Sequence, residues 1–264
     1  GQANFVVLLL LLGGLWSLRA GRDVPAGLMT AGAAAIKMTP ALLLVFLAWR
    51  RRWVALASAA IALAVLVVAG AAAAGWSSYV VYMERMVPLL SQGCAHWVNE
   101  SLAAFFTRLV DGGDMFSWAI SHPSPMTRAL TLLASLVVVG VSFLLVGRRQ
   151  RCLDLEFALL VQTTLFVSPL SWTHHSVLSL MSFLLVARHL ARRDEMTIRM
   201  AGLLAISFTL VHVYGKPPGL LERGALNVLA SYNLFGNLLL WGIIAMLLRR
   251  EKAHAAASPM RAAG

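Results

Sequence analysis

The chain has 264 residues, of which 59% are hydrophobic and only 12% are charged, and its mean hydropathy is +0.78. This composition is too apolar for a soluble domain and predicts a protein that crosses a membrane several times. The formal net charge of +11 does not indicate nucleic-acid binding, because the arginines gather at the ends of apolar runs and no basic stripe with interleaved aromatic residues is present.

The first apolar run, Phe5 to Leu18, is about one membrane span long if residues 1–4 are included. The chain enters this run without an initiator methionine or a charged region before a cleavage site. We therefore interpret it as the later part of a longer protein and not as a signal peptide.

The second run, Val24 to Trp49, is apolar at both ends and carries Lys37, Thr39 and Pro40 in its middle. It fits either one long kinked helix or two half-helices hinged at residues 38–40. The hinged alternative is favoured, because irregular backbone at membrane depth is tolerated where it lines a cavity. Lys37 then points into that cavity, whereas in the other alternative its stem snorkels towards the interface.

The cluster Arg50-Arg51-Arg52 places the start of the next run, Trp53 to Ala74, on the cytoplasmic side. A long connection, Trp76 to about Pro125, follows and is predicted to be external because it has few basic residues. Tyr79 to Leu90 and Glu100 to Val110 show helical spacing of apolar residues, which predicts short helices in the outer interface.

The remaining apolar runs alternate between the two faces and return to basic clusters on the cytoplasmic side. The predicted fold is an all-α polytopic membrane protein with about eight or nine membrane segments and one long external loop. Residues 1–252 form the membrane-embedded region, and residues 253–264 are predicted to be a disordered cytoplasmic tail. These later runs are Met126 to Val146, Leu155 to Val167, Ser176 to Ala187, Ile198 to Val213 and Leu226 to Leu248.

A polar stretch, Ser168 to His175, separates two of these runs and is predicted to be their turn, because Pro169 cannot continue a helix. The adjacent His174 and His175 are costly in hydrocarbon unless they face water, a ligand or a partner. One alternative is an interfacial Trp and His pair without chemistry. The other is a catalytic role, in which an imidazole hydrogen-bonds or protonates a phosphate of the outer leaflet.

No metal and no cofactor are predicted. Adjacent histidines at a helix start project about 100 degrees apart, and no carboxylate lies near them in the sequence. Phosphate-cradling glycine loops, paired cysteine ligands and a nucleophile elbow are all missing from the sequence. In the long loop, Arg108 is the preferred phosphate ligand because a guanidinium can bind it bidentately. Lys37, Asn99 and Trp172 are the other predicted substrate-binding residues.

Four segments in register resemble glycosyltransferase family 87, the polyprenyl-phosphate-mannose-dependent mannosyltransferases. The resemblance extends from Gly1 to roughly Leu185. The segments are Gly1-Gln2-Ala3-Asn4, the stretch from Ala26-Gly27 to Ala33-Ala34-Ala35-Ile36-Lys37-Met38-Thr39-Pro40 followed by Arg50-Arg51-Arg52-Trp53, Asn99-Glu100-Ser101-Leu102, and Ser168-Pro169-Leu170-Ser171-Trp172-Thr173-His174-His175.

The resemblance implies a GT-C membrane fold that moves mannose from a polyprenyl-phosphate donor to a glycolipid or glycan on the outer face of a bacterial cell membrane. The implied reaction is an inverting displacement that requires no metal. In it, His174 and His175 contact the donor phosphate or assist its departure. The implied general base is an acidic residue in the first external loop, which precedes Gly1. Glu100 departs from the Gln that the family pattern leads us to expect.

Two alternative functions remain open. One is transfer of a pentose, such as arabinofuranose, from a similar lipid donor. The other is a transporter or flippase for a lipid-linked sugar, since Lys37 on a broken helix is also typical of transporters.

Overall fold

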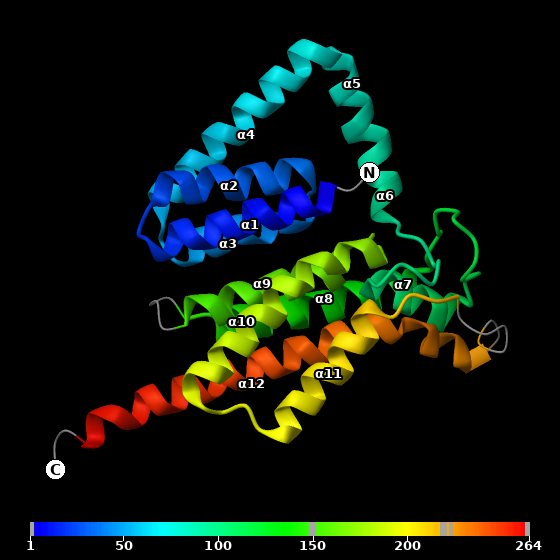
Figure 1. Cartoon of the computed structure of the whole chain (residues 1–264). Coiled ribbons are helices and arrows are strands. Elements are labelled where there is room, and N and C mark those ends of the chain that lie inside the picture. The colour runs from blue at the N-terminus through cyan, green and yellow to red at the C-terminus, as the bar shows by residue number, and fades with distance from the viewer. Residues whose placement is uncertain (1–2, 148–151, 217–220, 222–223, 262–264) are drawn as a thin grey trace.

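The computed structural model describes residues 3–147, 152–216, 221 and 224–261. Within these ranges the regular elements are helices, and one isolated β-bridge joins Asn99 to Trp172. Figure 1 shows the bundle helices running roughly side by side, with an arm of two helical segments projecting from them. The all-helical fold predicted from the sequence is confirmed.

The first layer contains α1 (Ala3–Arg19), α2 (Asp23–Ile36) and α3 (Leu42–Trp49), which lie beside one another in Figure 1. Helix α2 ends because Lys37 is extended, and a 3-10 turn at Thr39–Ala41, with Pro40 near its start, leads into α3. Arg52 pairs with Asp23 at 2.5 Å, so both basic clusters lie at the same end. The hinged alternative is therefore confirmed, and the single kinked helix is wrong.

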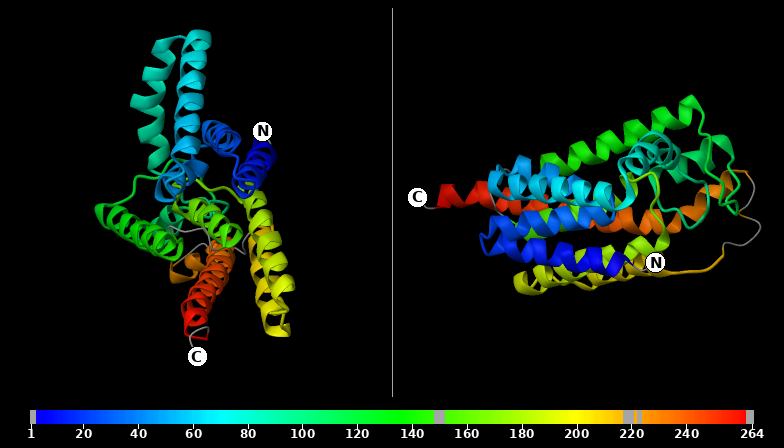
Figure 2. Two further views of the ribbon diagram at one scale, coloured as in Figure 1. Left: turned by 90° about the vertical axis from the view of Figure 1, so that its left-hand side faces the viewer. Right: turned by 90° about the horizontal axis from the view of Figure 1, so that it is seen from above.

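The projecting arm begins with α4 (Trp53–Ala74) and turns back at Gly75, whose φ of 83° is left-handed. Next come α5 (Trp76–Val81), a π-helical turn (Tyr82–Met86) and α6 (Val87–Ser91), which join without a break. Figures 1 and 2 show this second segment running across the direction of the bundle helices. A helix over residues 79–90 is thus present as predicted, and its place in the outer interface stays a prediction.

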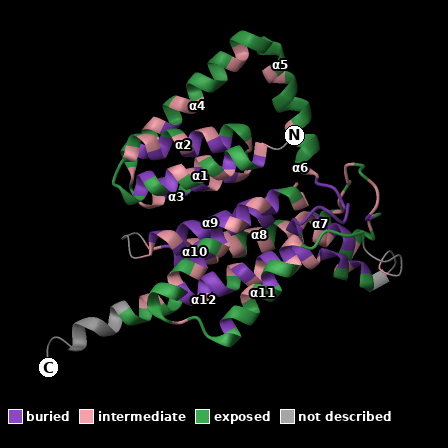
Figure 3. Cartoon of the chain, viewed as in Figure 1, coloured by how far each residue is buried: buried purple, intermediate pink, exposed green. Residues whose placement is uncertain are grey.

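The second layer is built around α9 (Leu153–Val167), in which every residue except Asp154 and Val167 is buried (Figure 3). A helix that is buried on every side has no face exposed to solvent, which is why its sequence shows no separate polar face. The helices that complete this layer are α8 (Pro125–Leu145), α10 (Val177–Arg193), α11 (Ile198–His212) and α12 (Tyr232–Arg261).

Three described helical stretches are long and apolar enough to cross a membrane: Trp53–Ala74, Pro125–Leu145 and Leu226–His254. Few residues of the first two are buried inside the protein, as expected of surfaces that lipid covers. Shorter apolar helices accompany them, so the number of spans stays a prediction. Helix α12 continues to Arg261, into the segment predicted to be a disordered tail, and residues 262–264 lie outside the described ranges.

The rest of the long loop folds over one end of the bundle as a cap. Residues 93–102 are buried, and α7 (Leu102–Phe106) runs on into a π-helical turn (Thr107–Asp111). The helix predicted over residues 100–110 is thus present, but it is packed inside the protein. Its prediction as an interfacial helix is wrong, because Leu102, Ala104 and Arg108 face the interior.

Candidate functional site

The break after α2 meets the turn between α9 and α10. Lys37 Nζ lies 2.5 Å from Nε2 of His175, although 138 positions separate the two residues in the sequence. Lys37 reaches this position because the chain leaves the helix there, and His175 because a short 3-10 turn (Thr173–Ser176) precedes α10. The structure therefore brings together two of the predicted site residues.

Both histidines line the same cavity but differ in environment. His175 is 6% exposed, whereas His174 is exposed, and their rings meet edge to face with centroids 4.7 Å apart. Burial, followed by the charge of Lys37, lowers the pKa of His175 to about 3 and also lowers the pKa of His174. Both imidazoles are consequently neutral at pH 7. A neutral His175 accepts a hydrogen bond from Lys37 and keeps a buried Nδ1 that has no partner among the described residues.

The cavity has a volume of about 730 Å³ and is walled mainly by apolar side chains, and its lining includes Lys37, Trp172, His174 and His175. No carboxylate of the described part of the chain forms an ion pair with Lys37. An ammonium group beside an apolar cavity is stabilised by an anion that enters it. The site is therefore suited to a ligand with one anionic group and an apolar remainder. Other lining residues include Ile36, Leu42, Tyr82, Leu90, Val167 and Leu170.

Asn99 holds the cap against the histidine turn. Its Nδ2 donates to the carbonyl oxygens of Cys94 at 2.9 Å and Pro169 at 3.1 Å, and its Oδ1 accepts from the backbone N–H of Ser171 at 3.0 Å. Asn99 is fully buried, so the structure does not bring it to the cavity as a substrate ligand. The role that these contacts give Asn99 is structural: it connects the cap to the turn that carries the histidines.

Arg108 is also occupied by the protein. It is 2% exposed and donates to the carbonyl oxygens of Ala95, His96 and Asn99 and, at 2.8 Å, to Ser231 Oγ. These four acceptors occupy Nη1 and Nη2 of the guanidinium, and the buried Nε has no partner among the described residues. The structure thus separates Arg108, predicted as a phosphate ligand, from the cavity.

Two further residues fix the histidine turn, and their roles were not predicted. Asn4 donates from Nδ2 to the carbonyl oxygen of His174 at 2.8 Å. Glu100 accepts from Ser176 Oγ at 2.7 Å and from Asn237 Nδ2 at 3.0 Å, and burial raises its pKa to about 8. The signal in the sequence was that both residues lie in segments that carry the family resemblance, Gly1-Gln2-Ala3-Asn4 and Asn99-Glu100-Ser101-Leu102.

The model of glycosyltransferase family 87 matches residues 1–169, well over half of the chain. This chain belongs to glycosyltransferase family 87. No curated protein and no solved structure matches it. The matched range includes Lys37 and ends at Pro169, whereas the resemblance in the sequence extends past the two histidines.

Membership of glycosyltransferase family 87 implies a transferase that uses a lipid-linked sugar donor. The observed cavity is consistent with this class of substrate, because it offers a cation to a phosphate and an apolar wall to a lipid chain. The cavity lies at the break after α2 that Pro40 predicted.

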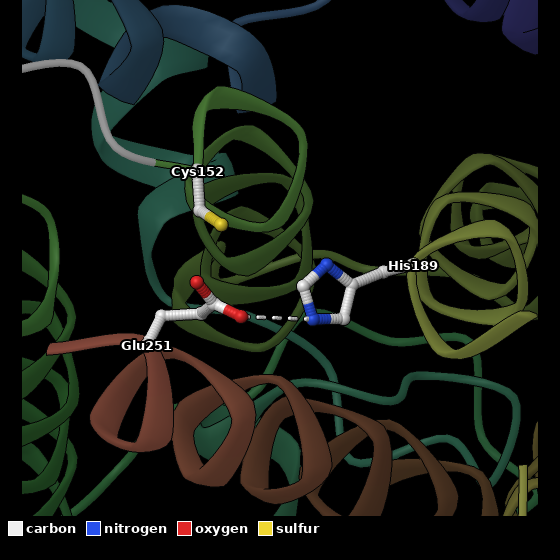
Figure 4. Close-up of side chains that lie close together, drawn as sticks. All are labelled: Cys152, His189 and Glu251. Carbon is white, nitrogen blue, oxygen red and sulfur yellow. Dashed lines mark ion pairs between the residues drawn. The ribbon is translucent and has the colours of Figure 1, made fainter. Parts of the chain in front are cut away.

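One described group of side chains can hold a metal ion, and it lies at the opposite end of the bundle. Cys152 precedes the first turn of α9, His189 lies near the end of α10, and Glu251 lies in the second half of α12; their side chains converge (Figure 4). Glu251 also accepts from Arg193 at 2.7 Å. Helix α9 alone spans roughly 22 Å, so this group is remote from His175 and cannot take part in chemistry there.

Proposed function

We propose that this chain is the donor-binding part of a membrane mannosyltransferase that moves mannose from a polyprenyl phosphate to a glycolipid or glycan on the external face of a bacterial membrane. The observation that carries the proposal is the contact between Lys37 and His175 at the wall of a largely apolar cavity. Uncompensated positive charge beside an apolar wall suits a lipid phosphate better than a soluble nucleotide sugar.

In the proposed reaction, a hydroxyl of the acceptor attacks the anomeric carbon of the donor sugar. The bond between that carbon and the phosphate oxygen breaks, and the polyprenyl phosphate departs with one additional negative charge. Lys37 stabilises this charge, and a preorganised cation or donor at such a point contributes on the order of 3 kcal/mol. The proton of the acceptor hydroxyl goes to an acidic general base, which the family resemblance leads us to expect in the first external loop.

The two histidines have different roles in this proposal. His175 is buried and touches Lys37, so it positions the ammonium group. His174 is exposed on the cavity wall and can donate a hydrogen bond to a phosphate oxygen or a sugar hydroxyl. Trp172 lines the cavity beside them and supplies apolar surface to the donor.

The test is donor turnover in the full-length protein reconstituted in liposomes with polyprenyl-phosphate mannose. Lys37→Met should lower kcat about a hundredfold, because the charge on the leaving phosphate is then unopposed. His175→Gln should cause a smaller loss, and Lys37→Arg should restore part of the activity. The matched control is Lys216→Met, which removes a lysine that stacks over Phe116 outside the cavity.

Parent-like turnover of Lys37→Met, with equal expression and melting temperature, would contradict the proposal. Two alternatives are tested with the same liposomes. Transfer from a polyprenyl-phosphate arabinofuranose donor and not from the mannose donor would identify a pentosyltransferase. Movement of the labelled lipid-linked sugar across the bilayer without transfer would identify a flippase, which the broken helix at Lys37 also allows.

A further inference from the structure

A second cavity, of about 420 Å³, also adjoins the histidine turn and is lined by Thr173, His174 and Ser176. Among the described residues, His174 is the one side chain that lines both cavities. Both volumes lie within the range of about 300–1,000 Å³ that is typical of small-molecule sites. The residues around the second cavity are Phe5, Thr173, His174, Ser176, Val177, Leu180, Val211, His212, Val213 and Tyr214.

A transferase needs its two substrates to meet at one bond. In a displacement at the anomeric carbon, the acceptor hydroxyl approaches from the side opposite to the departing phosphate, so the two ligands occupy adjoining spaces with little protein between them. Two cavities that share a single residue have this arrangement. With the donor phosphate beside Lys37 in the first cavity, the second is the adjoining space in which an acceptor can reach His174.

The wall of the second cavity combines aromatic surface with hydrogen-bonding groups. Tyr214 is 74% exposed and packs against Trp97 with ring centroids 5.5 Å apart. His212 approaches the carbonyl oxygen of Phe208 through Nδ1 at 3.0 Å, and its buried Nε2 has no partner among the described residues. If Nδ1 carries the proton, Nε2 is left as an acceptor facing no protein donor.

This combination is the chemistry that recognises a carbohydrate ring, whose C–H face packs on an aromatic side chain while its hydroxyls hydrogen-bond to polar groups. We propose that the second cavity is the acceptor site and that it binds the sugar end of the acceptor, stacked on Tyr214 and hydrogen-bonded to His212. Either a glycolipid or a free glycan can occupy this site, because both carry a sugar. This inference rests on the proposed function, which supplies the donor in the first cavity.

The experiment compares two tyrosines, one at each cavity. Tyr214→Ala should raise the KM for the acceptor about tenfold and leave the KM for the donor unchanged, because one aromatic stacking surface is lost. Tyr82→Ala, which removes a side chain from the wall of the first cavity, should raise the donor KM and leave the acceptor KM unchanged. Tyr79→Ala, on the projecting arm and outside both cavities, is the control that changes neither.

A binding measurement that needs no turnover accompanies the kinetics. Mannotriose should change the tryptophan fluorescence of the parent, through Trp97 beside Tyr214, and should have little effect on Tyr214→Ala at the same concentration. His212→Gln should weaken binding less than His212→Ala, because the amide oxygen of Gln can still accept.

The outcomes separate the two proposals. If the parent transfers sugar but Tyr214→Ala keeps a parent-like acceptor KM and fluorescence response, the acceptor site is overturned and the donor site stands. If Tyr214→Ala raises the donor KM instead, the two cavities form one lipid channel and the inference is also overturned. If the parent binds mannotriose through Tyr214 but transfers no sugar from any polyprenyl-phosphate donor, the proposed function fails while the saccharide site stands.

Discussion

Arginines at one end of the bundle and Lys37 at the other differ in how the protein compensates their positive charge. At the end that carries the basic clusters, arginines are paired with carboxylates: Arg19 with Asp154 at 2.6 Å, Arg50 with Glu156, and Arg193 with Glu251 at 2.7 Å. At the other end, the partner that the described residues give Lys37 is the neutral His175, and Lys37 lines a cavity.

This contrast shows how a structural cation differs from one placed for a ligand. A buried charge needs a compensating charge or several acceptors, and the protein itself supplies these to Arg50 and to Arg108. For Lys37 it supplies one imidazole. We propose that an anionic ligand completes the compensation, so that the cation is structural at Arg50 and Arg108 and functional at Lys37.

The largest effect is expected from breaking the buried pair at the basic end. Arg50 and Glu156 have side chains only 6% and 2% exposed, and Glu156 also accepts from the backbone N–H of Gly147 at 3.1 Å. Glu156→Ala leaves the arginine buried without its counter-ion, which costs about 3–5 kcal/mol. We expect a marked fall in melting temperature in detergent, with kcat per folded molecule unchanged.

Asp154→Ala is the matched control, because it breaks a pair at the same end that is roughly a third exposed. Its effect should be below about 1 kcal/mol. Equal melting temperatures for Glu156→Ala and the parent would contradict the structural role assigned to this end. If the folded Glu156 variant loses kcat, the basic end also affects catalysis, which would contradict its purely structural role.

A smaller effect is expected at Glu100, where the cap meets the histidine turn. Its folded pKa of about 8 exceeds its ordinary value of 4.5, so the folded state holds the proton more tightly than the unfolded state. Stability should therefore fall as pH rises from about 4.5 to about 8 and level off above that. Glu100→Gln keeps an oxygen that accepts from Ser176 and Asn237 and should remove this pH dependence.

Melting curves at pH 5.5 and pH 8.5 compare the parent with Glu100→Gln, and Glu84→Gln on the exposed arm serves as control. Parent-like loss of stability between the two pH values in the Glu100 variant would mean that another group causes it.

The sequence predicted the fold where a local rule decides the outcome. Pro40 and the polar residues before it predicted the break after α2, and the basic clusters predicted which ends of the helices lie together. Both are properties of a few neighbouring residues, and both are confirmed by the turn at Thr39–Ala41 and the pair of Arg52 with Asp23.

The site was only partly predictable, because burial and partners depend on segments far apart in the chain. Lys37 and the histidines were identified from the cost of placing them in hydrocarbon, but their contact spans 138 positions. Arg108 and Asn99 have side chains that suit phosphate and sugar, and no local pattern could reveal that backbone carbonyl groups already occupy them. The second cavity depends on packing between α1, α10 and α11 and leaves no motif.

The last prediction concerns which end of the bundle faces outward. The cysteine substitutions that test it are expected to change neither activity nor stability. The basic clusters predict that the end with the paired arginines is cytoplasmic and that the histidine turn with its cap is external. Single cysteines at Ala119, on the exposed surface of the cap, and at Met196, between α10 and α11, test this in a background with Cys94 and Cys152 replaced by serine. Because a charged maleimide does not cross the membrane, it should label the Ala119 site in intact cells and the Met196 site only after permeabilisation. The reverse pattern would place both cavities on the cytoplasmic side, and the acceptor would then have to be an intracellular glycan or glycolipid.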